Sequence, residues 1–208
     1  MTWMIWTGAL VAYGLFLGWY DNWSGPLKPD EIDRLMATLK GTPGGEHNDL
    51  GTIRRFLEQD DGREFVMVNL VKVHKGDVPH PVTGAPTPGR EVMSHYTNNF
   101  LPALLRRGGH PAVVARKVGG YIDAWQVGPD PGWTIVGFMR YRSRRDMAEL
   151  AGDPRFTEIH PFKMAATAET FSFPTQTMLL AYVSPRVWVA LVFALLASLA
   201  QIVVLAGA

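Results

Sequence analysis

The chain has 208 residues, and its 20 Lys and Arg nearly balance 19 Asp and Glu, for a formal net charge of +1. This balance gives no electrostatic reason to expect nucleic acid or an acidic partner. Cysteine is absent, which excludes disulfides, thiolate metal ligands and a cysteine nucleophile. Walker, GxGxxG, GxSxG and HEXXH motifs are also absent, so the common sites that they mark are not predicted.

The first apolar stretch, Trp3 to Tyr20, contains no charged residue and is just long enough to cross a hydrocarbon core of about 30 Å. Tryptophans near both ends suit the two headgroup regions. A cleaved signal peptide is the alternative, but a basic segment and a small-residue cleavage site are missing. We therefore expect a retained transmembrane helix in residues 1–23.

A second apolar stretch, Val187 to Leu205, has only Ser198 and Gln201 as polar interruptions. Ser184 is a natural N-cap, and Pro185 suits the first helical turn because its missing N–H needs no partner there. This pattern predicts a second transmembrane helix in residues 184–208.

Both apolar stretches carry small residues four positions apart, a spacing that lets helix backbones approach closely. We expect these residues to form a helix-packing face, within one chain or between chains, although Gly and Ala are also simply common in membrane helices. The residues are Gly14, Gly18, Ala190, Ala194 and Ser198.

Two spanning helices place everything between them on one side of the membrane. The basic residues near the membrane, Lys28, Arg34 and Arg186, lie on that side, whereas the far ends have no Lys or Arg. The positive-inside rule then predicts an integral protein of a bacterial-type inner membrane with its domain in the cytoplasm.

The segment after the first helix, residues 24–63, is predicted to be a linker with two short helices. Asp30 caps the first, which ends at Lys40, and Asn48 or Asp49 caps the second, which ends near Gly62. The glycine-rich stretch between them, residues 42–46, is predicted to be a loop.

Residues 64–180 show the alternating pattern of an α+β domain. The first strand, Glu64–Val73, is apolar on both faces, which is typical of a strand covered on both sides. Four prolines and three glycines predict a long loop at 74–89, and Pro102 predicts a kink in the helix that follows. The remaining expected elements are a helix at 90–107, strands at 112–118 and 134–141 with a short one at 121–127, helices at 143–150 and 155–168, and a strand at 170–180. The core order βαββαβ is ferredoxin-like.

Several segments together resemble the dimeric α+β-barrel superfamily, in its branch of uncharacterised small domains. They are DLGTIRRFLEQDDG before FVMVNLVKV, the LRRGG that ends the long helix, and WTIVGFMRYRSRRDM followed by DPRFTEIHPFKMAA. The resemblance covers residues 49–177 and implies that two copies pair their sheets face to face. The two apolar ends and the long 74–89 loop depart from the family pattern.

The resemblance also implies candidate chemistry, because the superfamily includes cofactor-free monooxygenases and heme-degrading enzymes. By position, His160 matches their axial histidine and Asn69 their strand asparagine, whereas Tyr141 stands where the heme enzymes have Trp. The alternative is that His160, directly before Pro161, lies at a surface kink and points to solvent while Asn69 bonds neighbouring backbone. We expect this alternative.

Other titratable residues give weaker patterns. His95 beside Tyr96 is a candidate pair for acid–base work, although a lone His next to a buried Tyr is more often structural. His74 and His80 flank the proline-rich loop without further ligands, so no metal site is predicted.

Two functions remain open. The first is an accessory or scaffolding subunit of a larger membrane protein complex, with the α+β domain as an association module. It would be anchored in the lipid bilayer and associated with a membrane protein partner or with itself, without catalysis or cofactor. The second is a membrane-tethered enzyme, monooxygenase-like or heme-binding, that acts on a small apolar molecule.

Overall fold

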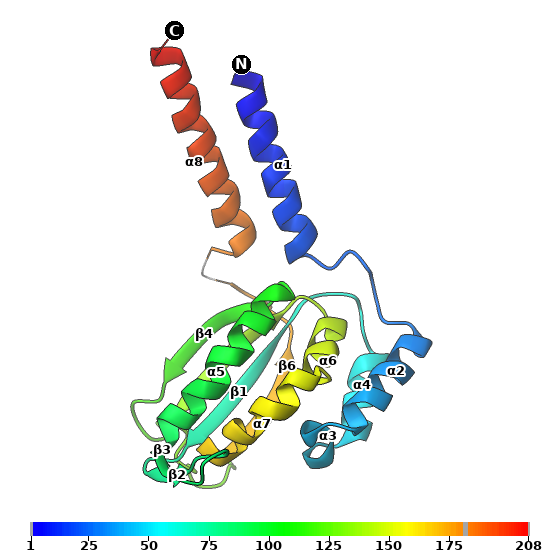
Figure 1. The fold of residues 1–208 in the computed structure, drawn as a ribbon, viewed down its shortest axis with the longest axis vertical. Helices are drawn as coiled ribbons and strands as arrows, with labels where there is room; N and C mark the ends of the chain where they lie inside the picture. Colours follow the sequence, from blue (N-terminus) through cyan, green and yellow to red (C-terminus); the bar gives the residue numbers. More distant parts are fainter. Residues whose placement is uncertain (1, 181–182, 208) are drawn as a thin grey trace. The chain divides into compact units, whose positions relative to one another are not determined.

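The computed structural model describes residues 2–180 and 183–207, so the expected ranges 1–23 and 184–208 include two end residues that lie outside it. The chain divides into two compact units, Met1–Trp23 with Thr177–Ala208, and Ser24–Gln176. Figure 1 draws the helices and strands of both units.

The first unit is a pair of helices, α1 (Thr2–Tyr20) and α8 (Pro185–Ala206). By length and composition, α8 is the one helix of the described residues that meets the requirements of a membrane span. This finding supports the transmembrane helix expected at α8. That α1 also spans the membrane remains a prediction.

Polar contacts join the two helices at both ends. The Trp6 indole donates to the Gln201 side chain (2.6 Å) and the Tyr13 hydroxyl to the Arg186 carbonyl (3.1 Å). Arg186 also pairs with Asp21 at 2.7 Å. Because the start of α1 meets the end of α8, the two helices run antiparallel.

The second unit is a mixed α+β fold around one four-stranded sheet. Its strand order is β4 (His110–Arg116), β5 (Ile135–Tyr141), β1 (Phe65–Val73), β6 (Thr167–Thr175), and every neighbouring pair is antiparallel. The chain passes through β1, α5, β4, β5, α6, α7 and β6, as the sequence predicts. Residues 121–127 form no strand and instead belong to an irregular loop.

Three helices lie along one face of this sheet: α5 (Gly89–Arg106), α6 (Arg144–Ala151) and α7 (Pro154–Ala166) (Figure 1). Phe65 and Tyr141 of the sheet pack with Leu104, Leu150 and Phe156 of the helices to form the main core. Pro161 lies inside α7 without ending it, in agreement with the single helix predicted at 155–168.

Three short helices precede the sheet: α2 (Pro29–Lys40), α3 (Pro43–His47) and α4 (Leu50–Glu58). Asp49 caps α4 by accepting from the N–H groups of Gly51 and Thr52, as predicted. The predicted loop at 42–46 is wrong, because most of it forms α3. Leu57 packs with Leu39 and Ala148 in a second core cluster, which ties these helices to α6.

The predicted loop at 74–89 contains a small hairpin, β2 (Asp77–Pro79) with β3 (Pro86–Pro88). Val78 of this hairpin is buried against Val92, Phe162 and Ala166 of α5 and α7. The proline-rich segment is therefore packed onto the domain.

Candidate functional site

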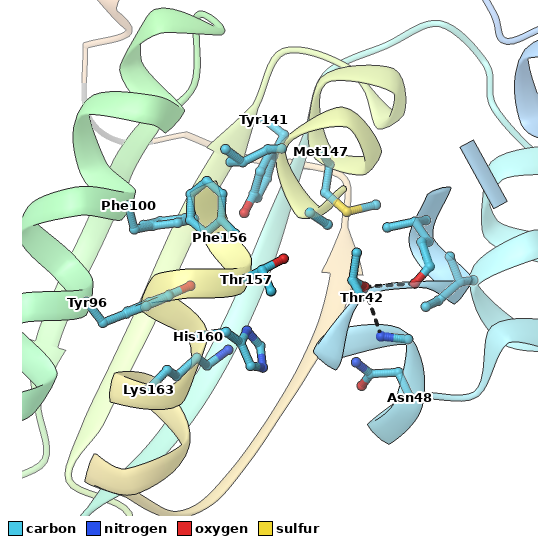
Figure 2. Close-up of a pocket in the computed structure, with 15 residues that line it drawn as sticks. Thr42, Asn48, Tyr96, Phe100, Tyr141, Met147, Phe156, Thr157, His160 and Lys163 are labelled. Carbon is cyan, nitrogen blue, oxygen red and sulfur yellow. Dashed lines mark hydrogen bonds between the residues drawn. The ribbon is translucent and has the colours of Figure 1, made fainter. Parts of the chain in front are cut away.

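A cavity of about 180 Å³ lies between the helical layer and the short N-terminal helices (Figure 2). Its apolar wall includes Phe100, Phe156, Ile53 and Met147, and several polar side chains converge on it. The polar side chains are Thr42, Asn48, Tyr96, Tyr141, Thr157, His160 and Lys163. Among the described residues that line the cavity, none is Asp or Glu.

Two phenols meet at this cavity from different elements. Tyr141 is the last residue of β5, where its ring stacks on Phe65 at 5.3 Å, and Tyr96 comes from α5. Burial raises the pKa of Tyr96 to about 12. Burial, with the nearby Tyr96, raises the pKa of Tyr141 even further above its usual value. Both hydroxyls therefore stay protonated at neutral pH and act as hydrogen-bond donors.

His160 and Lys163 reach the cavity from α7, three residues apart and so on the same face of the helix. The Lys163 ammonium lies 5.7 Å from the centre of the Tyr96 ring. Burial lowers the pKa of Lys163. Burial also lowers the pKa of His160, with smaller contributions from the positive charges of Lys163 and His47. The cavity thus gathers basic groups.

The turn before α3 forms the opposite wall. The Thr42 hydroxyl donates to the Leu39 carbonyl (2.7 Å) and accepts from the Gly45 N–H (3.1 Å), which fixes the chain as it enters α3 (Figure 2). Asn48, just after α3, also lines the cavity. Without these N-terminal helices, this side of the cavity would be open.

The structure brings two of the four predicted site residues together. Tyr141 and His160 line the cavity, so the expectation that His160 points to solvent is wrong. Asn69 is elsewhere: its amide donates to the carbonyls of Met67 (3.0 Å) and Gly137 (3.4 Å), as expected. His95 is exposed and stacks on Phe162 with ring centres 3.9 Å apart, outside the cavity.

Lys163 is the site residue that the sequence did not single out. A lysine on a helix usually lies in solvent, so nothing in its type marks it as buried. The spacing of Thr157, His160 and Lys163, one turn apart on α7, is the signal that could have indicated one polar face.

The predicted helix-packing residues are only partly engaged. No heavy atom of another described segment lies within 4 Å of a Cβ built on Gly14 or Gly18, so α8 does not pack against them. Ala197 is the buried residue of α8, and the Ser198 hydroxyl donates to the Ala194 carbonyl of its own helix. Ala190 is only partly covered. Packing of these glycines between chains remains a prediction.

Heme is the cofactor that the family resemblance implies for His160. The cavity is smaller than the roughly 300–1,000 Å³ of pockets for drug-sized ligands, and a heme is a large ligand. The residues present therefore do not fit a heme. Among the described residues, no three His, Asp or Glu side chains are placed to hold a metal ion.

No family model and no curated protein matches this chain. Two crystal structures resemble its fold, one of a methylated RPA0582 protein and one of the RPA0582 protein of unknown function from Rhodopseudomonas palustris. Their identities to this chain are 20% and 19%, with TM-scores of 0.53 and 0.52. They cover 65% and 64% of this chain and 96% of their own. At this identity the likeness shows the fold alone.

Proposed function

We propose that this protein is a membrane-anchored accessory or scaffolding subunit whose α+β domain is an association module. The domain is assigned a ferredoxin-like topology, in keeping with its strand order β4-β5-β1-β6, and membership of the dimeric α+β-barrel superfamily. The observation that carries the proposal is the apolar face of the sheet that no helix of the domain covers.

Side chains alternate between the two faces of a strand. Phe65 and Met67 of β1 point toward the helices, so Val68 and Leu70 point to the opposite face of the sheet. Val68 lies between Phe138 and Phe173 in the register, and Leu70 lies between Val136 and Phe171. These two rows form the open face, in which Val68 itself is buried between its neighbours. Phe171 and Phe173 stack on each other, yet are 47% and 44% exposed.

Contiguous apolar surface of this kind marks an interaction site in a soluble domain. Burying one Phe or Leu contributes about 1.5–3 kcal/mol, so two aromatic-rich rows supply a strong drive to association. A second copy is the simplest partner, because the same rows on both subunits form a self-complementary two-fold interface.

The membrane part of the proposal rests on the two helices. Both α1 and α8 lack charge over most of their length, and α8 meets the length and composition of a span. We place the domain on the cytoplasmic side, where Lys28, Arg34 and Arg186 favour it.

The mass of the full chain in mild detergent tests this proposal. The wild type is expected to be a dimer, and Phe173→Glu a monomer, because a carboxylate cannot be buried unpaired. Ser172→Glu is the matched control: it adds the same charge one residue away, on the opposite face. A monomeric wild type would refute the dimer, and a dimer that survives Phe173→Glu would place the interface elsewhere.

The cavity favours a second candidate, a membrane-tethered enzyme that acts on a small molecule. Tyr141 and His160 converge there, as an enzyme would require, but Asn69 does not join them. Turnover of any substrate should then depend on both cavity residues. Activity unaffected by Tyr141→Phe and by His160→Ala would exclude this cavity as the active site.

A further inference from the structure

The cavity combines hydrogen-bond donors and basic groups without a counterion. Of its lining residues, Lys163 offers an ammonium when it is protonated, Tyr96 and Tyr141 are phenols, and His160 is an imidazole. The structure gives Lys163 no ion pair with any described residue, and no acidic side chain lines the cavity. An unpaired ammonium away from water is costly, so such a group calls for an anion.

The two phenols have unused donors. Within the described part of the chain, neither the Tyr96 nor the Tyr141 hydroxyl donates a hydrogen bond, although both side chains are largely withdrawn from solvent. Figure 2 shows both oxygens directed toward the middle of the cavity, with the His160 ring and the Lys163 nitrogen lower in this view. An acceptor placed in the cavity would satisfy several donors at once.

The rest of the lining limits what that acceptor belongs to. Phe100 and Phe156 form an aromatic edge-to-face pair at one wall, and Ile53, Met147 and Leu150 complete an apolar surround. The volume of about 180 Å³ is close to that of an engineered cavity of about 150 Å³ that binds benzene. The ligand therefore has an apolar body about the size of one ring.

We propose that this cavity binds a small organic monocarboxylate with an apolar body, its carboxylate held by Lys163, Tyr96 and Tyr141 and its body by Phe100 and Phe156. His160 lies beside the carboxylate as a further donor. A charge-assisted hydrogen bond from Lys163 and neutral ones from the phenols match the four lone-pair positions of a carboxylate. The site does not depend on the open face of the sheet, so it goes beyond the association proposed above.

Binding to the purified full chain in detergent, measured by isothermal titration calorimetry, tests this assignment. The probes are acetate, benzoate, benzyl alcohol and inorganic phosphate. Benzoate is expected to bind at least tenfold more tightly than each of the others, because benzyl alcohol lacks the charge and acetate and phosphate lack the ring. Equal binding of benzyl alcohol or phosphate, or no binding of benzoate, would overturn the proposal.

Variants then locate the site. Lys163→Met keeps the length of the side chain and removes the charge, and it is expected to weaken benzoate binding at least tenfold. Lys75→Met, an exposed position in the proline-rich segment, is the control and is expected to leave binding unchanged. Tyr141→Phe removes only the hydroxyl and is expected to weaken binding several-fold while the protein stays folded. Unchanged benzoate affinity in both Lys163→Met and Tyr141→Phe would place the carboxylate elsewhere.

Discussion

Replacement of Leu57 by Ala tests whether the short N-terminal helices are an integral part of the domain. Leu57 lies on α4 and has no exposed surface. It packs with Ile32 and Leu39 of α2 and with Ala148 of α6. The substitution would therefore leave a cavity where three helices meet, next to the wall of the candidate site.

The expected loss follows from the size of the missing side chain. Leu→Ala at a fully buried position lowers the free energy of unfolding by about 2–5 kcal/mol, depending on how far the surroundings collapse. For a protein of this size each kcal/mol lowers Tm by about 2–4 °C. The variant should thus melt roughly 4–20 °C below the wild type.

Thermal unfolding of the full chain in detergent, followed by near-ultraviolet circular dichroism, measures this change. Leu105→Ala is the matched control. Because Leu105 is 40% exposed on α5, this substitution should change the free energy of unfolding by no more than about 0.5 kcal/mol. A Leu57→Ala variant as stable as the Leu105→Ala control would show that α4 is not packed as described.

Three further predictions concern single positions. The Arg155 guanidinium, with a further contribution from Arg107, lowers the pKa of Asp153 in the folded protein. The ionised carboxylate therefore stabilises the fold at pH values above its ordinary pKa of about 3.9, and this stability is lost as the pH falls through the lower folded value. Asp153→Asn keeps the helix cap but should lower the free energy of unfolding at pH 7 by roughly 1.5–3 kcal/mol. Denaturant titrations of both proteins at pH 7 and at acid pH check whether the stability difference between wild type and variant shrinks in acid. Gly109→Ala places a Cβ 2.8 Å from the Arg140 carbonyl oxygen and should destabilise the domain by about 1–3 kcal/mol, whereas Gly119→Ala, with open space around it, should not. If Gly14 packs between chains, Gly14→Leu should weaken association in detergent, and unchanged assembly would mean that the glycine is only compositional.

Much of the domain follows from local signals in the sequence. The apolar runs at 64–73 and 134–141 predicted β1 and β5 nearly to their ends, and the helices expected at 143–150 and 155–168 correspond to α6 and α7. The apolar second face of β1 was also visible in the sequence, and in the single domain it is left open.

The errors come from tertiary packing that overrides local preference. Pro161 lies within α7, as in the helix predicted at 155–168, and Phe162, directly after it, is buried with Val92 and Ala166. His160 is therefore carried to the cavity. At the turn before α3, the Thr42 hydroxyl accepts from the Gly45 N–H and starts a helical turn where glycines suggested a loop.

The site could be predicted only in part for a similar reason. Tyr141 and His160 stood out through a family resemblance, whereas Lys163 owes its role to burial beside Tyr96, which no local pattern encodes. The cavity needs segments about 100 residues apart in the chain, such as Thr42 and Tyr141, to lie together. Pairing of this kind comes from the topology and not from periodicity.

The absence of cysteine in the natural chain allows the most direct test of the open sheet face. Val113 and Val114 are neighbours on β4, both exposed at 41% and 58%, but they point to opposite faces, and Val113 pairs with Phe138 in the apolar row. In the purified full chain in detergent, Val113→Cys is expected to react with a maleimide at least tenfold more slowly than Val114→Cys, and equally fast after denaturation. Equal rates in the folded protein would show that the sheet face is uncovered and would contradict the proposed association.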